Sequence, residues 1–374
     1  MPDQLDDLRA RIAAVDQELV RLAGERLRLA TEVGKAKLLD GLPIRNYDTE
    51  SEVLTRFARL AGAEGIDPEF AKRFAALLIA EAVRRQEDGR TLAGGSIAGT
   101  KVTDSMSILV VGGAGKMGRW FVRFFHGQGH RVVTQDPAGS VDGFPHIDSL
   151  AGATEFDVVV LAMPLSQGPR VLRQVLALKP QGLVLDISSL KSHLLDALRG
   201  GAEAGFRVAS LHPLFGPEVR TLAGRVMAVC DCGNPDAAAA AARLFDGTAL
   251  TITRIPVERH DEYMQYGLGL SHLVSILFFS TLTQSGMSFA DLATMASTTF
   301  LKQARTAAEV ASENPEMYAE IQRLNRHSAE LYRLVRDCLE SLEAAALTGE
   351  PSQFVEIMLA GKAWFPATLP QDLG

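Results

Sequence analysis

The sequence of 374 residues has little cysteine and no excess of positive charge. Its three cysteines, Cys230, Cys232 and Cys338, are too few for a disulfide framework, so the chain suits a reducing cytoplasm. Cys230 and Cys232 have no further cysteine or histidine at metal-ligand spacing, so we expect buried apolar side chains there and no metal. The net charge of −7 argues against a nucleic-acid or an anionic-membrane partner.

Long apolar runs are also scarce. The amino-terminal segment is acidic and amphipathic, and it has no apolar core of the kind found in signal peptides. We expect no apolar stretch that approaches the roughly 20 residues of a membrane-spanning helix. The prediction is a cytoplasmic protein with no membrane partner.

The first 87 residues carry a helical pattern in three segments. Further helices over about 48–61 and 68–86 follow the first, with glycine and proline between them. The first helix is predicted over residues 4–38 from apolar residues at steps of three and four: Leu5, Leu8, Ile12, Val15, Leu19, Leu22, Leu29 and Val33. Since this seam runs for about five heptads, we expect it to pack against a partner chain.

Residues 88–105 are rich in glycine, serine and threonine and predict a linker. Beyond it, strand-like runs alternate with helical segments, which is typical of a parallel α/β sheet. The expected strands are 108–111, 132–134, 158–162, 183–187, 208–211 and 226–229. Strands are expected to stop near residue 256, and helical patterns follow to about residue 363.

Two cations interrupt the apolar seam of the first helix. Arg26 stands where the seam expects a leucine, and Lys37 lies eleven residues further on, on nearly the same face. Cations on a buried stripe are costly unless an anion meets them. They therefore either pair with glutamates and reach solvent, or line a pocket for a carboxylate substrate.

The first domain resembles the all-helical chorismate mutases over about residues 4–87, most specifically in the stretches EVGKAK and LPIR. In that family the long helix pairs in an intertwined dimer. The reaction is a pericyclic rearrangement, so it needs no nucleophile. Catalysis consists of holding a compact conformer and placing cations where the breaking ether gains negative charge.

The resemblance also assigns roles to five side chains of this domain. It implies that Arg9 reaches across to the partner's site, and that Arg26 and Lys37 hold the carboxylates and the ether oxygen. Glu50 would bind the ring C4 substituent, and Gln86 the ether oxygen.

Three positions depart from the mutase pattern. Asn46 and Thr49 stand where the family often has aspartate and arginine, and Ala82 replaces a serine of the third helix. The missing arginine removes a cation from the neighbourhood of the pocket. The mutase activity is either weakened or directed to an altered substrate.

The segment after the first strand fits a dinucleotide-binding loop. Gly113, Gly115 and Gly118 form G-x-G-x-x-G between strand 108–111 and a helix that begins near Lys116. They permit a tight turn, close approach of the backbone to a pyrophosphate, and helix–strand packing, respectively. The cofactor-binding residues expected on this basis are Gly113, Gly115, Lys116, Met117, Gly118, Asp136 and Met163.

Asp136 indicates which dinucleotide binds. It ends the second strand, eighteen residues after Gly118. A carboxylate there can bind a ribose 2′-hydroxyl and would repel a 2′-phosphate. The predicted cofactor is NAD.

Three polar motifs end strands of the predicted sheet. They are Ala162-Met163-Pro164, the DISSLK stretch from Asp186 to Lys191, and the LHPLFGPE stretch around His212. Substrates and cofactors of open α/β sheets bind at the carboxyl edge, where these motifs are expected to meet.

The stretches GGAGKMGRWF, DISSLK and LHPLFGPE together resemble the prephenate dehydrogenase family, and the similarity covers about residues 106–365. The resemblance implies that His212 accepts a hydrogen bond from the ring C4 hydroxyl while hydride leaves C4 for the nicotinamide. Decarboxylation then gives an aromatic product. Ser189 and Lys191 would line the substrate pocket.

The helical patterns near the end of the chain contribute two further candidates. By resemblance, a histidine on the helix that starts near Glu258 enters the substrate pocket, and we expect this to be His272, with His260 a weaker candidate. The family's arginine before the N-P-E-x-Y-A-E-I-Q stretch is replaced here by Glu309. Arg305, or Lys302 beside it, would supply the missing cation.

The expected fold is therefore multidomain. An all-α mutase-like domain at 1–90 is followed by a linker at 91–105, an α/β Rossmann domain at 106–253, and an all-α substrate and dimerisation domain at 254–374. We expect a homodimer that acts on small molecules.

Three hypotheses about function stay open at this point. The first is a bifunctional enzyme that converts chorismate through prephenate to 4-hydroxyphenylpyruvate in tyrosine synthesis. The second acts on the 4-amino-4-deoxy analogues of both substrates and makes 4-aminophenylpyruvate. The third is a dehydrogenase whose first domain is a non-catalytic dimerisation or regulatory module.

Overall fold

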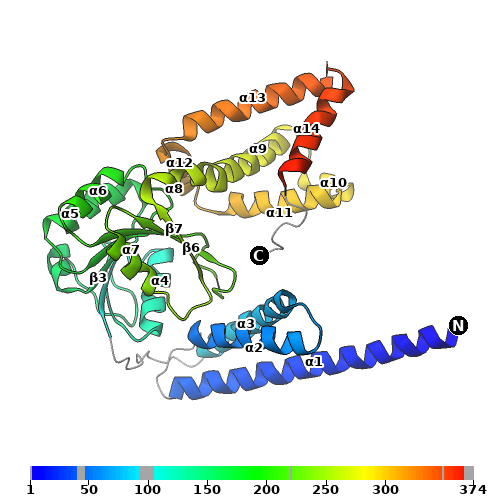
Figure 1. The fold of residues 1–374 in the computed structure, drawn as a ribbon, viewed down its shortest axis with the longest axis horizontal. Coiled ribbons are helices and arrows are strands. Elements are labelled where there is room, and N and C mark those ends of the chain that lie inside the picture. Colours follow the sequence, from blue (N-terminus) through cyan, green and yellow to red (C-terminus); the bar gives the residue numbers. More distant parts are fainter. Residues whose placement is uncertain (1, 40–46, 92–104, 220, 348, 366–374) are drawn as a thin grey trace.

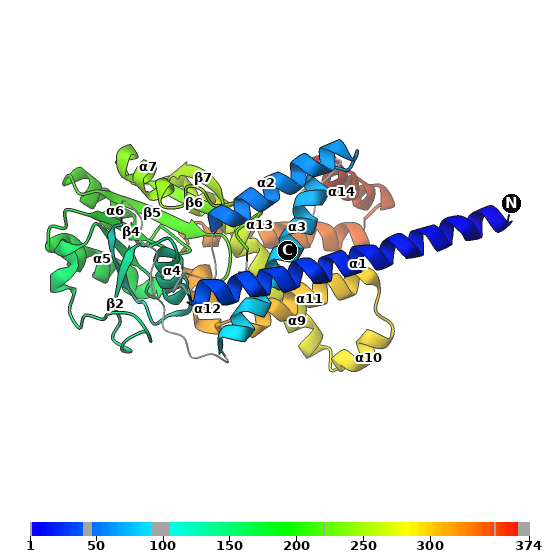
Figure 2. The same cartoon turned by 90° about the horizontal axis from the view of Figure 1, so that it is seen from below.

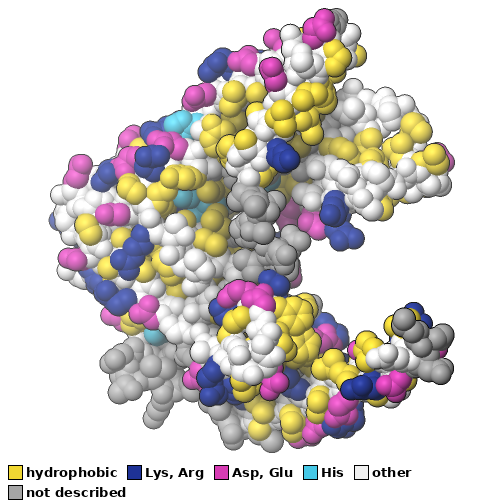
Figure 3. Space-filling model, turned by 45° about the vertical axis from the view of Figure 1, so that its right-hand side comes forward, with side chains coloured by type: hydrophobic (Ala, Val, Ile, Leu, Met, Phe, Trp, Pro, Cys, Tyr) yellow, Lys and Arg dark blue, Asp and Glu magenta, His cyan; other side chains and the backbone are white. Residues whose placement is uncertain are grey.

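The computed structural model describes residues 2–39, 47–91, 105–219, 221–347 and 349–365. They form a helical unit, a central α/β unit and a second helical unit, in chain order (Figure 1). Both helical units lie on the same side of the central unit, and the space-filling view shows a hollow between them (Figure 3).

The first helical unit consists of α1 (Pro2–Leu39), α2 (Tyr47–Ala63) and α3 (Pro68–Thr91), which confirms the three predicted helices. Helix α3 packs against both α1 and α2, and Leu54, Ala75 and Ile79 form a small core. The amino-terminal part of α1 extends past the rest of the molecule (Figures 1 and 2).

The apolar seam of α1 is exposed in the single chain. Leu5 is 50% exposed, Ile12 61% and Leu19 52%. A row of large apolar side chains in water is unfavourable by about 1.5–3 kcal/mol for each side chain that could be buried instead. The expected packing against a partner chain stays a prediction, and the exposed seam is what such packing would cover.

The central unit is a seven-stranded sheet in the order β2-β1-β3-β4-β5-β6-β7. Its strands are β1 (Ser107–Val111), β2 (Arg131–Gln135), β3 (Val158–Leu161), β4 (Leu183–Asp186), β5 (Val208–Pro213), β6 (Val226–Asp231) and β7 (Thr251–Pro256). All six predicted strands are present, and β7 is an additional edge strand. Four of its six residues are polar or proline and the strand is mostly exposed, so it lacks the apolar run used to find the others.

The expectation of a wholly parallel sheet is wrong at one pair. Strands β5 and β6 are antiparallel, with His212 opposite Ala228, whereas the other pairs are parallel. A parallel pair needs a crossover of a dozen or more residues, usually a helix. The described residues of the connection 214–225 contain no helix, so the chain returns beside β5 in the opposite direction.

Helices cover both faces of the sheet. In β1, Ile108 and Val110 face one core, whereas Leu109 and Val111 face the other. This alternation explains why the strand is apolar at every position. The covering elements are α4 (Lys116–Gly127) and α7 (Pro235–Arg243) on one face, and η1 (Leu150–Glu155), α5 (Gly168–Ala177) and α6 (Leu195–Glu203) on the other. The short turn η2 (Leu165–Gln167) packs through Leu165 against Leu190 and Ile321.

The two cysteines at the end of β6 are buried as predicted. Cys230 and Cys232 are both 0% exposed and pack in the same apolar core. Burial raises the pKa of the Cys230 thiol to about 12, so it is not a thiolate at neutral pH. Among the described residues no cluster of metal-ligand side chains is found.

The second helical unit begins directly after β7. It consists of α8 (Val257–Met264), a π-helical turn η3 (Gln265–Leu270), α9 (Ser271–Gln284), α10 (Phe289–Thr294), α11 (Thr298–Ser312), α12 (Pro315–Leu324), α13 (Ser328–Leu347) and α14 (Pro351–Trp364). The predicted helix from Glu258 thus runs on through three consecutive elements. The π turn between them was not predicted.

One continuous helix of this unit is long and apolar. By length and composition alone, Val257–Gln284 could cross a membrane, and only 11% of its most apolar window is buried. The expectation that no apolar stretch approaches membrane-spanning length is therefore wrong for this segment. Figure 3 shows apolar side chains gathered on this helical unit, which is typical of a surface that binds another chain.

Candidate functional site

The loop after β1 has the shape that a dinucleotide needs. Gly112 has φ +80, and a Cβ there would lie 2.5 Å from the carbonyl oxygen of Ala162. A Cβ on Gly118 would collide with the carbonyl oxygen of Gly112, which explains why α4 can start so close to the loop. The amino-terminal end of α4 is therefore open to a phosphate group.

Asp136 lies where the cofactor prediction places it, at the end of β2 beside this loop. Its Oδ2 accepts a hydrogen bond from the backbone N–H of Ala114 at 2.9 Å, and its Oδ1 accepts one from Ala138 at 2.8 Å. The carboxylate thus braces the glycine-rich loop. Because Asp136 is only half-buried, it also has a side open to a ribose hydroxyl.

The other expected cofactor residues surround the same edge. Met163 follows β3, whose end is tied to β1 by the Ala162 N–H donating to the carbonyl of Val111 at 2.8 Å. Lys116 and Met117 open α4. The structure brings these residues together at the carboxyl edge, at the point where the strand order reverses between β1 and β3.

His212 lies at one end of a buried, hydrogen-bonded chain of polar side chains. Its Nδ1 lies 3.0 Å from Nε2 of His260, and Nδ1 of His260 lies 2.7 Å from Oδ1 of Asp261. His212 is 3% exposed, His260 1% and Asp261 2%. His212 ends β5, whereas the other two belong to α8, so the chain joins the sheet to the second helical unit.

Asp261 is held as a carboxylate. It accepts hydrogen bonds from the backbone N–H of Lys191 at 2.9 Å and of Ser192 at 2.6 Å, and also from the Ser192 hydroxyl. Burial opposes ionisation, but the hydrogen bonds from His260 and Ser192 outweigh it and hold the pKa of Asp261 well below its usual range.

The two hydrogen-bonded histidines, His212 and His260, are neutral at physiological pH. Burial lowers the pKa of His212 well below the ordinary value, and the neighbouring His260 and the Lys191 ammonium lower it further. Burial likewise lowers the pKa of His260. A neutral imidazole at the carboxyl edge can accept a proton from a substrate hydroxyl.

The ammonium of Lys191 is buried and hydrogen-bonded within the protein. Its side chain is 1% exposed, and Nζ donates to Asp186 Oδ1 at 3.0 Å, to the carbonyl of Ser188 at 2.6 Å and to the carbonyl of Leu211 at 2.8 Å. These three acceptors use all the protons of the ammonium. Lys191 therefore positions the backbone next to His212, and its predicted contact with substrate stays a prediction. Ser189, between these residues, is half-buried.

His272 lies on α9 against α12. Its ring centroid is 4.3 Å from that of Tyr318, and burial lowers its pKa. Its Nδ1 is buried without a hydrogen-bond partner, so it can accept a partner that enters the site. Arg305 and Glu309 are exposed side chains of α11, one turn apart.

Two of the predicted mutase residues, Arg26 and Gln86, lie where α1 contacts α3. Arg26 is half-buried, donates to the carbonyl of Leu78 at 3.3 Å, and lies 6.0 Å from the ring centroid of Phe57. Gln86 donates to the carbonyl of Ala30, and Lys37 is half-buried with a pKa lowered by burial.

Arg9 is far along α1 from these residues. It pairs with Asp6 at 3.3 Å and is 68% exposed. The expected reach of Arg9 into the site of a second chain stays a prediction. Asn46 lies outside the described residues, Thr49 is exposed, and Ala82 is buried at 6% exposure.

Glu50 makes a contact that the sequence did not predict. Its Oε1 accepts hydrogen bonds from the backbone N–H of Leu222 at 3.0 Å and of Ala223 at 3.3 Å, and from the Thr221 hydroxyl. Glu50 is 7% exposed. The carboxylate expected at the ring C4 substituent thus also binds the connection that leads from β5 to β6.

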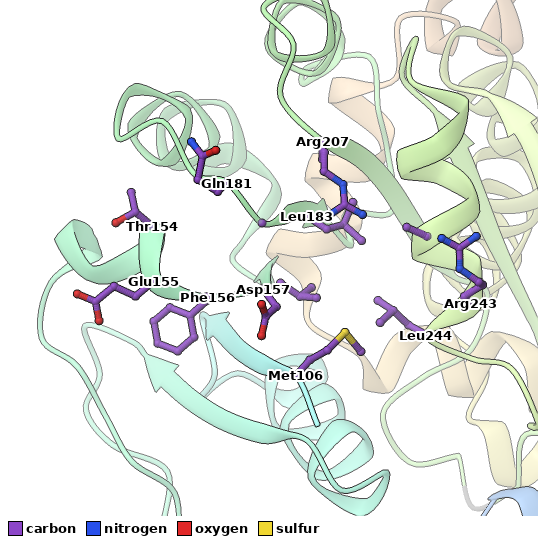
Figure 4. Close-up of a pocket in the computed structure, with 13 residues that line it drawn as sticks. Met106, Thr154, Glu155, Phe156, Asp157, Gln181, Leu183, Arg207, Arg243 and Leu244 are labelled. Atoms are coloured by element: carbon purple, nitrogen blue, oxygen red, sulfur yellow. The ribbon is translucent and has the colours of Figure 1, made fainter. Parts of the chain in front are cut away.

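A separate cavity of about 510 Å³ lies at the opposite, amino edge of the sheet (Figure 4). Arg207, Arg243 and Asp157 line it, together with Met106 and Leu244. Asp157 accepts hydrogen bonds from the backbone and the hydroxyl of Ser107, so its charge serves the fold. This cavity contains none of the predicted site residues.

Sequence reasoning treated His260 only as a weaker candidate and missed Asp261 and Ser192. The signal was present as the adjacent pair His260-Asp261 at the start of a helix. It could not be interpreted without the tertiary structure, because its partners lie 48 and 69 residues away.

Family models match all three units of the chain. Residues 8–87 match the chorismate mutase type II model, residues 140–248 the nucleotide-binding domain of prephenate dehydrogenase, and residues 256–359 its dimerization domain. The glycine-rich loop lies before the second of these matches. The expected isomerase and NAD-dependent oxidoreductase are both confirmed.

Individual proteins are similar to the whole chain or to part of it. The T-protein of Enterobacter agglomerans is 26% identical over 368 residues, 98% of this chain and 94% of the relative. A 4-amino-4-deoxyprephenate dehydrogenase of Streptomyces pristinaespiralis is 29% identical over 245 residues, 62% of this chain and 79% of the relative.

A solved structure has the fold of the last two units. The prephenate dehydrogenase from A. aeolicus, in complex with hydroxyphenyl propionate and NAD+, superposes with a TM-score of 0.56 at 18% identity, covering 70% of this chain and 98% of that one. The chain is therefore a chorismate mutase domain joined to the two domains of a prephenate dehydrogenase, the arrangement of the bifunctional T-protein family.

Proposed function

We propose that the chain converts chorismate to prephenate in its first domain and oxidises prephenate to 4-hydroxyphenylpyruvate in the other two. The observation that carries the second step is the buried chain His212–His260–Asp261 at the sheet edge that also bears the glycine-rich loop. It supports a neutral base at the same carboxyl edge of the sheet as the cofactor loop.

In this mechanism His212 takes the proton of the ring C4 hydroxyl. Bound NAD+ supplies the acceptor for the hydride of C4. As the bond between C1 and its carboxylate breaks, CO2 leaves and its electron pair enters the ring, and His212 returns the proton to the phenolate oxygen. His272 and Ser189 would orient the substrate, and Arg305 would supply a cation for a carboxylate.

Arg26 and Lys37 carry the proposal for the first domain. Both are half-buried cations, and burial lowers the pKa of each. Partly desolvated cations interact strongly with a dicarboxylate and with a developing negative charge on the ether oxygen. Glu50 and Gln86 would complete that site, with Arg9 from a second chain.

A homodimer in the cytoplasm is the proposed state. The exposed seam of α1 and the exposed apolar surface of Val257–Gln284 support it, since each offers a surface for a second copy. The latter segment lies in the match to a dimerization domain, which favours a subunit contact over a membrane span.

The full chain with chorismate and NAD+ tests both steps. We expect NADH and 4-hydroxyphenylpyruvate, with prephenate as an intermediate. Lys37→Ala should abolish NADH formation from chorismate but not from prephenate, whereas His212→Asn should abolish both. Absence of mutase activity from the wild type would favour a non-catalytic first domain, whereas mutase activity that is unaffected by Lys37→Ala would exclude the role proposed for Lys37.

A second candidate substrate is the pair of 4-amino-4-deoxy analogues, with 4-aminophenylpyruvate as product. It is favoured by the similarity to a 4-amino-4-deoxyprephenate dehydrogenase and by Glu309, an acidic side chain where the family has a cation. An acidic side chain suits a ring ammonium better than a hydroxyl.

Parallel NADH assays with the hydroxy and the amino substrates separate the two candidates. A kcat/KM for the amino analogue at least tenfold above that for prephenate would establish the amino pathway. Equal or better turnover of prephenate would exclude it.

A further inference from the structure

We propose that His260 and Asp261 are positioning residues of the dehydrogenase: they fix His212 in one tautomer, with Nε2 unprotonated toward the substrate, and stabilise the imidazolium that forms when His212 takes the substrate proton. This inference rests on the proposed function of His212 as the base. It assigns a role to two residues of α8 that do not touch the substrate themselves.

The direction of each hydrogen bond follows from Asp261. An ionised carboxylate only accepts, so Nδ1 of His260, 2.7 Å away, carries the proton. Neutral His260 then has a lone pair on Nε2. Nδ1 of His212, 3.0 Å from that atom, must donate to it. The remaining nitrogen of His212, Nε2, has the lone pair that a general base needs.

The alternative tautomers are disfavoured by the surroundings of Asp261. Two backbone N–H groups and a hydroxyl donate hydrogen bonds to Asp261. A protonated carboxyl would need an acceptor for its own proton, and these neighbours are donors. The charge is therefore fixed at one end of the chain. A fixed charge one residue removed from the base stabilises the transition state more than it stabilises the neutral ground state.

The charged groups near His212 and His260 come from two domains, the central unit and the second helical unit. Lys191 and Asp186 approach from β4 and the loop that follows it, and they pair with each other at 3.0 Å. Asp261 approaches from α8. Because the Lys191–Asp186 pair has no net charge, Asp261 is the unbalanced charge next to the histidines.

The relay, by which we mean the hydrogen-bonded residues His212, His260 and Asp261, also depends on how the second helical unit packs on the sheet. Asp261 binds the turn at Lys191 and Ser192, and Asn325 donates to the carbonyl of Asp261 at 3.0 Å. Thus α8 and the residue after α12 are fixed to the same point. The contacts of Asp261 therefore both hold the second helical unit against the sheet and select the reactive tautomer of His212.

Asp261→Asn is the most informative variant. The side-chain amide can donate to Nδ1 of His260, which would turn both histidines to the other tautomer and protonate the nitrogen of His212 that faces the substrate. We expect kcat with prephenate to fall about 10³–10⁴-fold, in line with the effect of a reversed tautomer in a serine protease triad. The KM for prephenate should change less than fivefold, because Asp261 does not touch the substrate and its effect is on the chemical step.

His260 is tested by two substitutions. His260→Ala removes the acceptor for Nδ1 of His212, and we expect a loss of about 10²–10³ in kcat, within the range for general acid–base groups. In His260→Gln the amide oxygen can lie near the position of Nε2 and accept the hydrogen bond, so kcat should be about tenfold higher than in His260→Ala. It should also shift the acidic limb of the pH profile of kcat/KM, which a merely structural role would not do.

Ser192→Ala removes one hydrogen bond to Asp261 without changing the direction of the others, so it should lower kcat much less than Asp261→Asn does. Mutase activity and NAD+ affinity of each variant report on folding. The relay is excluded if Asp261→Asn and His260→Gln both keep wild-type kcat and pH profile while His212→Asn is inactive. If His212→Asn is itself active, the proposed function fails instead. Should an Asp261 variant not fold, the two His260 variants decide.

Discussion

At the scale of single residues, the site depends on buried polar groups whose partners are all within the chain. Lys191 shows the principle most clearly, because its ammonium has three acceptors and almost no exposure. A buried charge is tolerated only with such partners. The same holds for Asp261, whose donors come from two domains.

Lys191→Met should therefore destabilise the protein strongly. It leaves the Asp186 carboxylate buried without its partner, which costs about 3–5 kcal/mol in comparable cases. Chemical denaturation of the variant measures this loss. The double variant with Asp186→Leu should recover most of it, because no uncompensated charge is left. A single variant as stable as the wild type would contradict this account of the pair.

The buried histidines predict how activity and stability depend on pH. The pKa values of His212 and His260 are lowered in the folded chain, so the unfolded chain binds more protons below its ordinary histidine pKa of about 6.5. Their contribution to stability is complete above that pH and is lost as the pH falls toward the folded values. Melting temperatures between pH 8 and pH 5 should fall, and less steeply in His260→Gln.

At the scale of elements, α1 is the clearest case of a helix whose partner is missing from the single chain. At about 1.5 Å per residue it is about 57 Å long, and among its described side chains the buried or half-buried ones occur only from residue 23 onward. The helix propensity of its residues does not stabilise a helix of this length alone, because most helical stability comes from packing of an apolar face.

Charged substitutions in the seam of α1 should separate the two activities. Ile12→Glu with Leu19→Glu places charges on the exposed stripe, so pairing of the mutase domains should be lost and mutase activity should fall more than tenfold. NADH formation from prephenate should persist. Val20→Glu is the control, because Val20 is 74% exposed and lies off the stripe. Sedimentation and separate assays measure the outcome; loss of both activities together would contradict it.

At the scale of the whole molecule, Glu50 links the mutase domain to the connection that follows the strand of His212. Hydrogen bonds to a charged group contribute about 1.5–3 kcal/mol each, and Glu50 accepts two from backbone N–H groups. Ala223 and Ala249 of the central unit pack on the same small core as Leu54. The two enzymes are therefore joined by a specific contact as well as by the linker.

Glu50→Gln should loosen this contact. The neutral amide is a weaker acceptor, so hydrogen exchange at the N–H groups of Leu222 and Ala223 should rise at least tenfold, as expected for a loss of about 1.4 kcal/mol. Glu52→Gln, an exposed position of the same helix, is the control. Unchanged exchange at both amides would show that the domains do not depend on Glu50 for their arrangement.

The sequence by itself determined the order of the three units, six strands, the glycine-rich loop and the place of His212 on a strand that ends at the carboxyl edge. These features are local: a helical period, a run of apolar residues, or a motif directly after a strand. Only the tertiary structure decided the antiparallel β5–β6 pair, the burial of Lys191, the contact of Glu50 and the chain from His212 to Asp261. Each of these depends on residues distant in sequence that meet through packing, and no local pattern encodes such a meeting.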